Sequence, residues 1–188
     1  MRIKRLIFHV GGPAFHPVAQ QARSIAQWLG DDFVCNLLVV MGLHWTGMNA
    51  DWVGGLTYRP LNERQKQSFE DYVASGRPLL CHHGGIASYD DWPQFGELLG
   101  FTWKRGVTNH SPFGTYKVTV PLSDHPLVTD MHDYELDDEL YYNVQITNGV
   151  TPTKLAYAVW EGQHLPMSWL SRGTSKRSGT FYLPGKRT

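Results

Sequence analysis

The sequence predicts an α/β domain with a mostly parallel sheet and helices on both of its faces. Two apolar runs, at 3–10 and 33–41, are typical of buried strands. Between them, apolar residues recur at helical spacing from Val18 to Leu29, and Gly30 provides a C-terminal stop. Two buried strands joined by an amphipathic helix form a βαβ unit, which implies a parallel sheet covered on both faces.

Helices are expected on either side of a third strand. Asn62 and Gln65 have the spacing of a capping box, which predicts the start of a helix, and Gly76 predicts its end. The apolar run at 78–82 predicts a short strand. Pro93 suits the first turn of a further helix, so this part of the chain repeats the strand, turn and helix order.

The second half of the chain predicts strands and few helices. Residues 115–120, 139–146 and 154–160 have the composition and alternation of strands. We expect them to extend the parallel sheet or to form an antiparallel flap over its edge. The segment 42–59 is rich in Gly, Trp and Asn and predicts a loop. Since no internal repeat or linker interrupts the pattern, we expect a single domain over 1–188.

Composition favours a small neutral partner. Seventeen basic residues balance seventeen acidic ones, which gives no support for binding to nucleic acid or to a membrane surface. No apolar stretch is long enough to span a bilayer, and no signal peptide is evident. Cys35 and Cys81 lie in apolar runs, as buried free thiols do. These features predict a cytoplasmic protein, and they are compatible with a homo-oligomer.

Short motifs occur in a distinctive order along the chain. They are Cys81-His82-His83-Gly84-Gly85, Asp91-Trp92-Pro93, Asp124-His125-Pro126 and Asp138-Glu139-Leu140-Tyr141-Tyr142. In order and spacing, these blocks resemble the ThuA-like (trehalose utilisation) family. The resemblance implies a three-layer, flavodoxin-like sheet related to class I glutamine amidotransferases. It also implies a role in the use of trehalose or other sugars, with a small sugar derivative as the partner.

The end of the chain departs from the pattern of the family. Where the family has a Gly-Lys-Gly-Arg-like turn and a final Gly-His, this sequence has Ser175-Lys176-Arg177-Ser178-Gly179 and later Pro184-Gly185-Lys186. The resemblance therefore implies a ThuA-like domain whose C-terminal end is shorter than that of the family or atypical.

The candidate catalytic residues are His82, His83 and Glu139. The two histidines follow the 78–82 strand, at the carboxyl end of the sheet where ligands bind in open α/β folds. The resemblance places His82 where amidotransferases hold a nucleophilic cysteine, while Cys81 should point into the sheet packing. Glu139 is a candidate general base or an orienting group for a histidine. The alternative is that a histidine only caps the helix and that Glu139 belongs to a solvated acidic run.

The candidate substrate-binding residues are His16, Trp45, His110, Asp138 and Tyr141. His16 and His110 belong to separate loops and are candidates to converge with the histidine turn. Tyr141 shares a strand face with Glu139 if the strand alternates. The aromatic face of Trp45 is suited to stacking on a sugar ring.

A divalent metal such as zinc is a candidate cofactor, with His82, His110 and Glu139 as its ligands. The alternative is that these residues never converge, since no tight metal-binding spacing is present. The turn Gly11-Gly12-Pro13 lacks the spacing of a dinucleotide fingerprint, so no nucleotide cofactor is expected.

Three functions remain open from the sequence. The first is hydrolysis or isomerisation of a trehalose-like or oxidised (keto) sugar derivative, with His82 or His83 as the acid/base. The second is a non-catalytic module that binds a sugar or another metabolite on an amidotransferase-like fold. The third is amidotransferase or peptidase chemistry through Cys81, which requires an exposed thiol beside a histidine.

Overall fold

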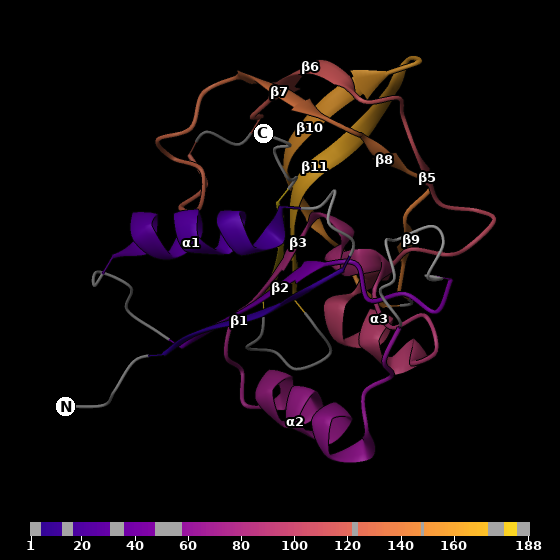
Figure 1. The fold of residues 1–188 in the computed structure, drawn as a ribbon. Helices are drawn as coiled ribbons and strands as arrows, with labels where there is room; N and C mark the ends of the chain where they lie inside the picture. Colours follow the sequence, from indigo (N-terminus) through magenta and orange to yellow (C-terminus); the bar gives the residue numbers. More distant parts are fainter. Residues whose placement is uncertain are drawn as a thin grey trace.

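The main sheet has eight strands and is mixed. The computed structural model describes residues 5–12, 17–30, 36–47, 58–121, 124–147, 149–172 and 179–183. The order across the sheet is β1-β2-β3-β12-β11-β10-β6-β7 (Figure 1). The parallel half contains β1 (Leu6–Gly11), β2 (Leu37–Gly42), β3 (Leu79–His82) and β12 (Gly179–Leu183). The antiparallel half contains β11 (Gln163–Arg172), β10 (Thr153–Trp160), β6 (Gly114–Thr119) and β7 (Tyr134–Asp138).

The predicted βαβ unit is confirmed. Helix α1 (Val18–Leu29) connects β1 and β2, which pair in parallel, and β2 pairs in parallel with β3. Side chains alternate along β2, so that Val39 and Met41 pack with Ala22 of α1. On the other face, Leu38 and Val40 pack with the cluster that contains Phe69 of α2 (Glu63–Ala74).

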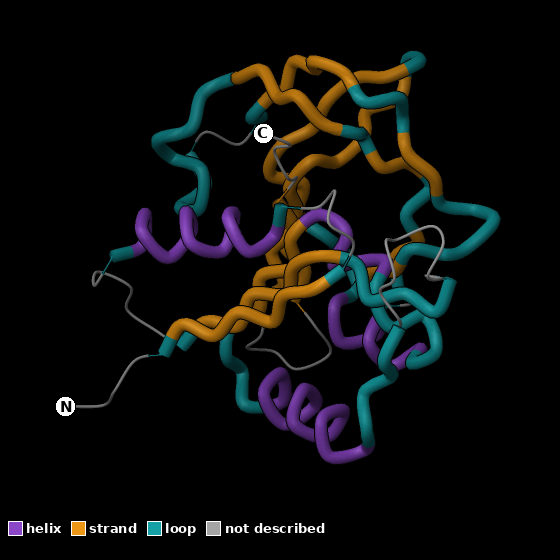
Figure 2. Tube along the Cα trace, viewed as in Figure 1, coloured by secondary structure: helices purple, strands orange, loops and turns teal. Residues whose placement is uncertain are grey.

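Helices therefore cover both faces of the parallel strands. Figure 2 shows α1 on one side of these strands and both α2 and α3 (Pro93–Leu99) on the other. The predicted capping box is present at the start of α2, where Asn62 and Gln65 each bond the backbone N–H of the other. The prediction of a mixed α/β fold with a parallel sheet is confirmed, whereas a three-layer arrangement of the whole sheet stays a prediction.

The prediction of a mostly parallel sheet is wrong for the second half. From β12 onward each neighbouring pair of strands in the sheet is antiparallel. Strands β11 and β12 were not predicted from the sequence. The described helices include none that is long and apolar enough to cross a membrane.

The single strand predicted at 139–146 is confirmed only in part. The strand in this region is β7, which ends at Asp138, and it is followed by two short strands, β8 (Tyr141–Tyr142) and β9 (Gln145–Ile146). These pair with β5 (Asn109–His110) and β4 (Phe101–Thr102) outside the main sheet.

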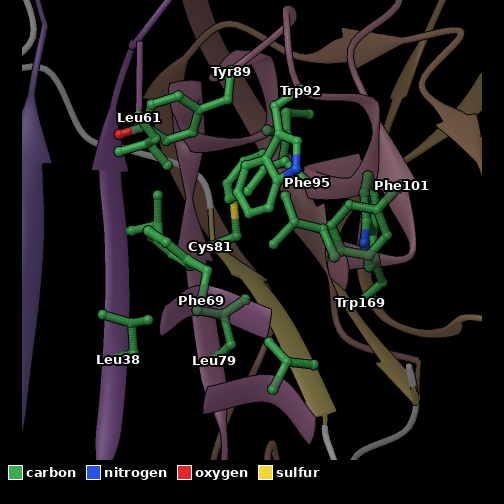
Figure 3. Packing of buried hydrophobic residues seen from close by; sticks show 14 of the residues in the cluster. Leu38, Leu61, Phe69, Leu79, Cys81, Tyr89, Trp92, Phe95, Phe101 and Trp169 are labelled. Carbon is green, nitrogen blue, oxygen red and sulfur yellow. The ribbon is translucent and has the colours of Figure 1, made fainter. Parts of the chain in front are cut away.

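A cluster of buried aromatic side chains lies between the parallel strands and helices α2 and α3. Figure 3 shows Phe69, Trp92 and Phe95 gathered around Cys81. The rings of Phe69 and Phe95 meet edge to face, with centroids 5.9 Å apart. Cys81 has no solvent exposure, as its position inside the strand predicted. This packing holds the end of β3, and the histidine turn that follows it, in a fixed position.

Candidate functional site

The turn after β3 begins with a residue in an unusual backbone conformation. His82 is still extended (φ −111°, ψ 127°) and pairs with Met41 of β2. His83 has φ +45° and starts the short 3₁₀ helix η1 (His83–Ala87). A non-glycine residue in this region costs roughly 1 kcal/mol or more, and such strain collects at functional sites. The strained position is therefore His83. It follows His82, the residue that the resemblance aligns with the nucleophilic cysteine of amidotransferases.

Gly85 allows this turn to pack closely on the sheet. A Cβ atom at Gly85 would lie 2.9 Å from the sulfur of Cys81 and 2.9 Å from the carbonyl oxygen of Val40. Real Cβ atoms do not approach other atoms so closely, so a larger residue would push η1 away from β2 and β3. The glycine thus fixes where the preceding histidines lie.

His83 is hydrogen-bonded on both ring nitrogens. Its Nε2 lies 3.1 Å from Oδ1 of Asp138, and the hydroxyl of Tyr141 lies 2.9 Å from Nδ1 and 3.3 Å from Nε2. With Asp138 as a carboxylate, Nε2 carries the proton and donates to Asp138, so the Tyr141 hydroxyl donates to Nδ1. All three residues are buried. We call this chain of hydrogen bonds the His83 relay.

Asp138 has no solvent exposure, and one of its two oxygens is unsatisfied. Oδ1 accepts the bond from His83 and a second bond, of 2.8 Å, from the backbone N–H of Glu139. Oδ2 is buried and has no hydrogen-bond partner among the described residues. A buried, unpaired carboxylate oxygen is costly. Asp138 has no solvent exposure, whereas His83 and Tyr141 are each slightly exposed, with 9% of the His83 side chain and 6% of Tyr141 accessible.

Glu139 lies next to the relay but pairs with His110. Its Oε2 is 3.7 Å from Nδ1 of His110, and that nitrogen also donates a 2.8 Å bond to the carbonyl of Ser111. His110 is partly exposed, with 43% of its side chain accessible. Trp103 lies between this pair and the relay, with its ring centroid 4.9 Å from that of Tyr141 and 6.4 Å from that of His110. The structure thus brings Tyr141, Asp138 and His83 together, with Glu139 and His110 beside them.

The predicted metal site is not supported. Among the described residues there is no group of three or more His, Cys, Asp or Glu side chains placed to hold a metal ion. Glu139 and His110 form a pair, but His82 is held in the β3 ladder, and its ring centroid is 6.4 Å from that of His83. The physical reason is that these residues follow different strands and only two of them converge.

The other predicted residues have separate environments. His16 lies outside the described residues. The guanidinium of Arg105 lies over the ring of Trp45, 4.6 Å from its centroid, and Arg105 also lies 3.6 Å from the carboxylate of Asp90. The same carboxylate accepts bonds from the backbone and the hydroxyl of Thr46. One face of Trp45 is therefore occupied by a cation rather than open for stacking on a sugar.

A second histidine cluster was missed from the sequence. His9 of β1 hydrogen-bonds to the hydroxyl of Tyr89, and the ring of His44, which follows β2, stacks on Tyr89 at a centroid distance of 5.2 Å. The His9 and His44 centroids are 4.7 Å apart. Burial, with a smaller contribution from His9, lowers the pKa of His44 to about 4, and burial also lowers the pKa of His9. The signal was available, because His9 lies two residues before the carboxyl end of β1 and His44 lies two residues after that of β2.

The environment of Cys81 is unsuited to nucleophilic catalysis. Burial strongly raises the pKa of its thiol, whereas reactive cysteines are exposed and have a lowered pKa. Its neighbours are the apolar side chains of the core cluster. The packing therefore contradicts the hypothesis of amidotransferase or peptidase chemistry at Cys81.

Comparison with known proteins places the chain in a family. The family model described as "ThuA: Trehalose utilisation" matches residues 41–185. A putative ThuA-like protein from Parabacteroides merdae has a similar fold, with a TM-score of 0.65 and 16% identity over 95% of this chain and 77% of that one. A putative ThuA-like protein from Bacteroides uniformis gives a TM-score of 0.59 and 16% identity over 95% of this chain and 79% of that one.

A similar fold also occurs inside a larger enzyme. Gan42B, a GH42 β-galactosidase from G. stearothermophilus, gives a TM-score of 0.58 and 12% identity over 100% of this chain and 28% of that one. At these identities the solved structures support the fold alone. No curated protein sequence matches the chain significantly. The match of the family model over most of the chain shows that this protein belongs to the ThuA family, whose description is trehalose utilisation.

Proposed function

We propose that this protein acts on a small sugar derivative, trehalose-like or oxidised to a ketone, by hydrolysis or isomerisation. The description of the family supports a sugar-related ligand. The observation that carries the proposal is the His83 relay, because a buried carboxylate, a histidine and a tyrosine in series form a unit for moving protons. A cytoplasmic location and a homo-oligomer remain predictions.

In this proposal His83 takes a proton from the substrate and later returns it. Asp138 orients the imidazole and stabilises the cation that forms when His83 is protonated, as the carboxylate does in a catalytic triad. The Tyr141 hydroxyl has two possible roles. It bonds Nδ1 until a substrate hydroxyl takes its place, or it transfers its own proton to Nδ1. Both proposed reactions need such a group, since ring opening, enolisation and attack by water all require a proton transfer.

Glu139 has a different role here from the one that the sequence favoured. Because its carboxylate pairs with His110, we assign the orienting function to Asp138. Glu139 and His110 are then candidates to bind substrate hydroxyls at the more exposed end of the site. His82 precedes the strained residue and supports the turn from within the β3 ladder.

A non-catalytic sugar-binding module is the second candidate. It is favoured by the deep burial of the relay, since a network this enclosed also stabilises the junction of β3, β7 and β8 without any reaction. The two candidates differ in what loss of His83 does. A catalytic His83 is needed for turnover and not for binding, whereas in a binding module there is no turnover and loss of His83 weakens binding only through folding.

Substitution of His83 by glutamine tests the proposal. Trehalose and its keto derivatives are offered to the purified protein, and turnover is followed by chromatography while binding is followed by calorimetry. We expect His83→Gln to lower kcat by roughly 10²–10⁴-fold with little change in binding. His132→Gln is the matched control, because His132 is exposed. Undiminished turnover in His83→Gln would refute the acid/base role, and binding without turnover in the wild type would favour the binding module.

A further inference from the structure

A cavity of about 270 Å³ lies beside the His83 relay in the antiparallel half of the protein. Its walls are formed by β8, β9, β10, β11 and the segments between them. The described residues that line it are Tyr141, Tyr142, Asn143, Val144, Ile146, Pro152, Lys154, Leu165, Pro166 and Trp169. Of these residues, Tyr141 alone is among the candidate substrate-binding residues predicted from the sequence.

The lining is mostly apolar and carries a single charge. Three of the side chains are aromatic and five are aliphatic or proline, while Asn143 and Lys154 are the polar exceptions. Lys154 and Trp169 are direct partners in the β10–β11 ladder, so the cation and the indole come from adjacent positions. This combination suits a ligand with an apolar face and a negative group.

Lys154 has no competing carboxylate among the described residues. None of the ion pairs of the described chain includes it, and its Nζ lies 6.0 Å from the ring centroid of Tyr157. Lys154 is an exposed residue, so its ammonium group is able to meet an anion without leaving a carboxylate. A neutral sugar, by contrast, needs several hydrogen-bonding groups around its hydroxyls, and the lining offers few.

The size of the cavity limits the ligand to about one ring. Small-molecule pockets commonly measure roughly 300–1,000 Å³, so this cavity is at the lower end of the range. We infer that the cavity binds a small organic anion with one apolar ring, such as an aromatic carboxylate, with the ring against Trp169 and Tyr142 and the carboxylate at Lys154.

Tyr141 connects this cavity to the relay. It belongs to the cavity wall, and its hydroxyl donates to His83. A ligand in the cavity therefore lies beside a residue of the proposed acid/base unit. The inference does not rest on the proposed reaction, because binding in the cavity requires no proton transfer.

Four probes separate the features of the ligand that matter. Phenylacetate has the ring and the charge, phenylacetamide has the ring alone, acetate has the charge alone, and glucuronate has a polar ring with a charge. Binding is measured with the full chain by ligand-observed NMR and calorimetry. We expect phenylacetate to bind about threefold more tightly than phenylacetamide, as an exposed ion pair allows, with no measurable binding of acetate or glucuronate. Equal binding of phenylacetamide, preference for glucuronate, or no binding of phenylacetate overturns the inference.

Two pairs of variants place the probe in this cavity. Lys154→Met should remove the preference for phenylacetate over phenylacetamide, while Lys154→Arg should keep it. Ile146→Trp should block the cavity and weaken both aromatic probes by at least tenfold. Val159→Trp is its control, because Val159 is similarly exposed (52%, against 54% for Ile146) but does not line the cavity. If the two tryptophan variants weaken binding equally, the site lies elsewhere and the inference is wrong.

Discussion

Much of the loss of folding stability at acidic pH should come from His44. Burial, together with the neighbouring His9, lowers the pKa of His44 from its ordinary 6.5 to about 4 in the folded protein. Because the folded value is lower than the unfolded one, the unfolded chain binds a proton first as the pH falls. The stability contributed by neutral His44 is therefore complete above about pH 6.5 and is lost between roughly pH 6.5 and pH 4.

The size of this effect follows from the two pKa values. One pKa unit corresponds to about 1.4 kcal/mol, so the full shift is equivalent to about 3 kcal/mol. Linkage gives a loss of about 2 kcal/mol in the free energy of unfolding between about pH 7.5 and about pH 5. The lowered pKa of His9 acts in the same direction and adds to the loss in the wild type.

Urea unfolding at the two pH values measures this loss. His44→Phe keeps a ring that can stack on Tyr89 and removes the titrating group, so its stability should fall by about 2 kcal/mol less than that of the wild type. His132→Gln should behave like the wild type, because His132 is exposed. The comparison uses the change with pH, so a lower stability of His44→Phe at both pH values does not affect it. Equal losses in His44→Phe and the wild type would refute the reasoning.

Two further predictions concern the packing beneath the histidine turn. The first uses a Cys35→Ser background. There, Cys81 should resist thiol reagents in the native protein and react only on unfolding, because its thiol is fully buried. Rapid labelling of the native protein by a chromogenic disulfide would contradict this. Gly85→Ala should lower the free energy of unfolding by roughly 1–3 kcal/mol in urea, because the new Cβ would meet the sulfur of Cys81 and the carbonyl of Val40; a variant as stable as the wild type would contradict it.

The parallel half of the fold could be predicted because its signals are local. The run at 37–42 is buried on both faces, and the capping box of α2 involves residues only three positions apart. The antiparallel half depends on pairing between distant segments. β12, near the end of the chain, pairs with β3 on one side and β11 on the other, and no local pattern specifies those partners.

The sequence indicated where the candidate site lies, but it did not indicate which carboxylate bonds His83. The rule that ligands bind at the carboxyl ends of parallel strands pointed to His83, which lies in a buried polar network, and its catalytic role stays a prediction. The same rule, applied to β1 and β2, would have found His9 and His44. The choice between Asp138 and Glu139 depended on which carboxylate at the end of β7 points inward, and the sequence suggested a solvated acidic run.

The alternation of side chains along β7 explains why Asp138 faces His83. In β7 the side chains of Leu136 and Asp138 are buried while Glu135 is exposed, so the acidic run is an alternating strand with one carboxylate facing inward. If Asp138 served only to tie β7 to the histidine turn, an asparagine would accept the same two bonds through its Oδ1 without the cost of burying a charge. What the carboxylate adds is a negative charge next to the imidazole of His83. In the proposed function, a carboxylate at this position stabilises the imidazolium that forms when His83 takes a proton. This carboxylate is therefore the feature by which the proposed acid/base unit differs from a purely structural network.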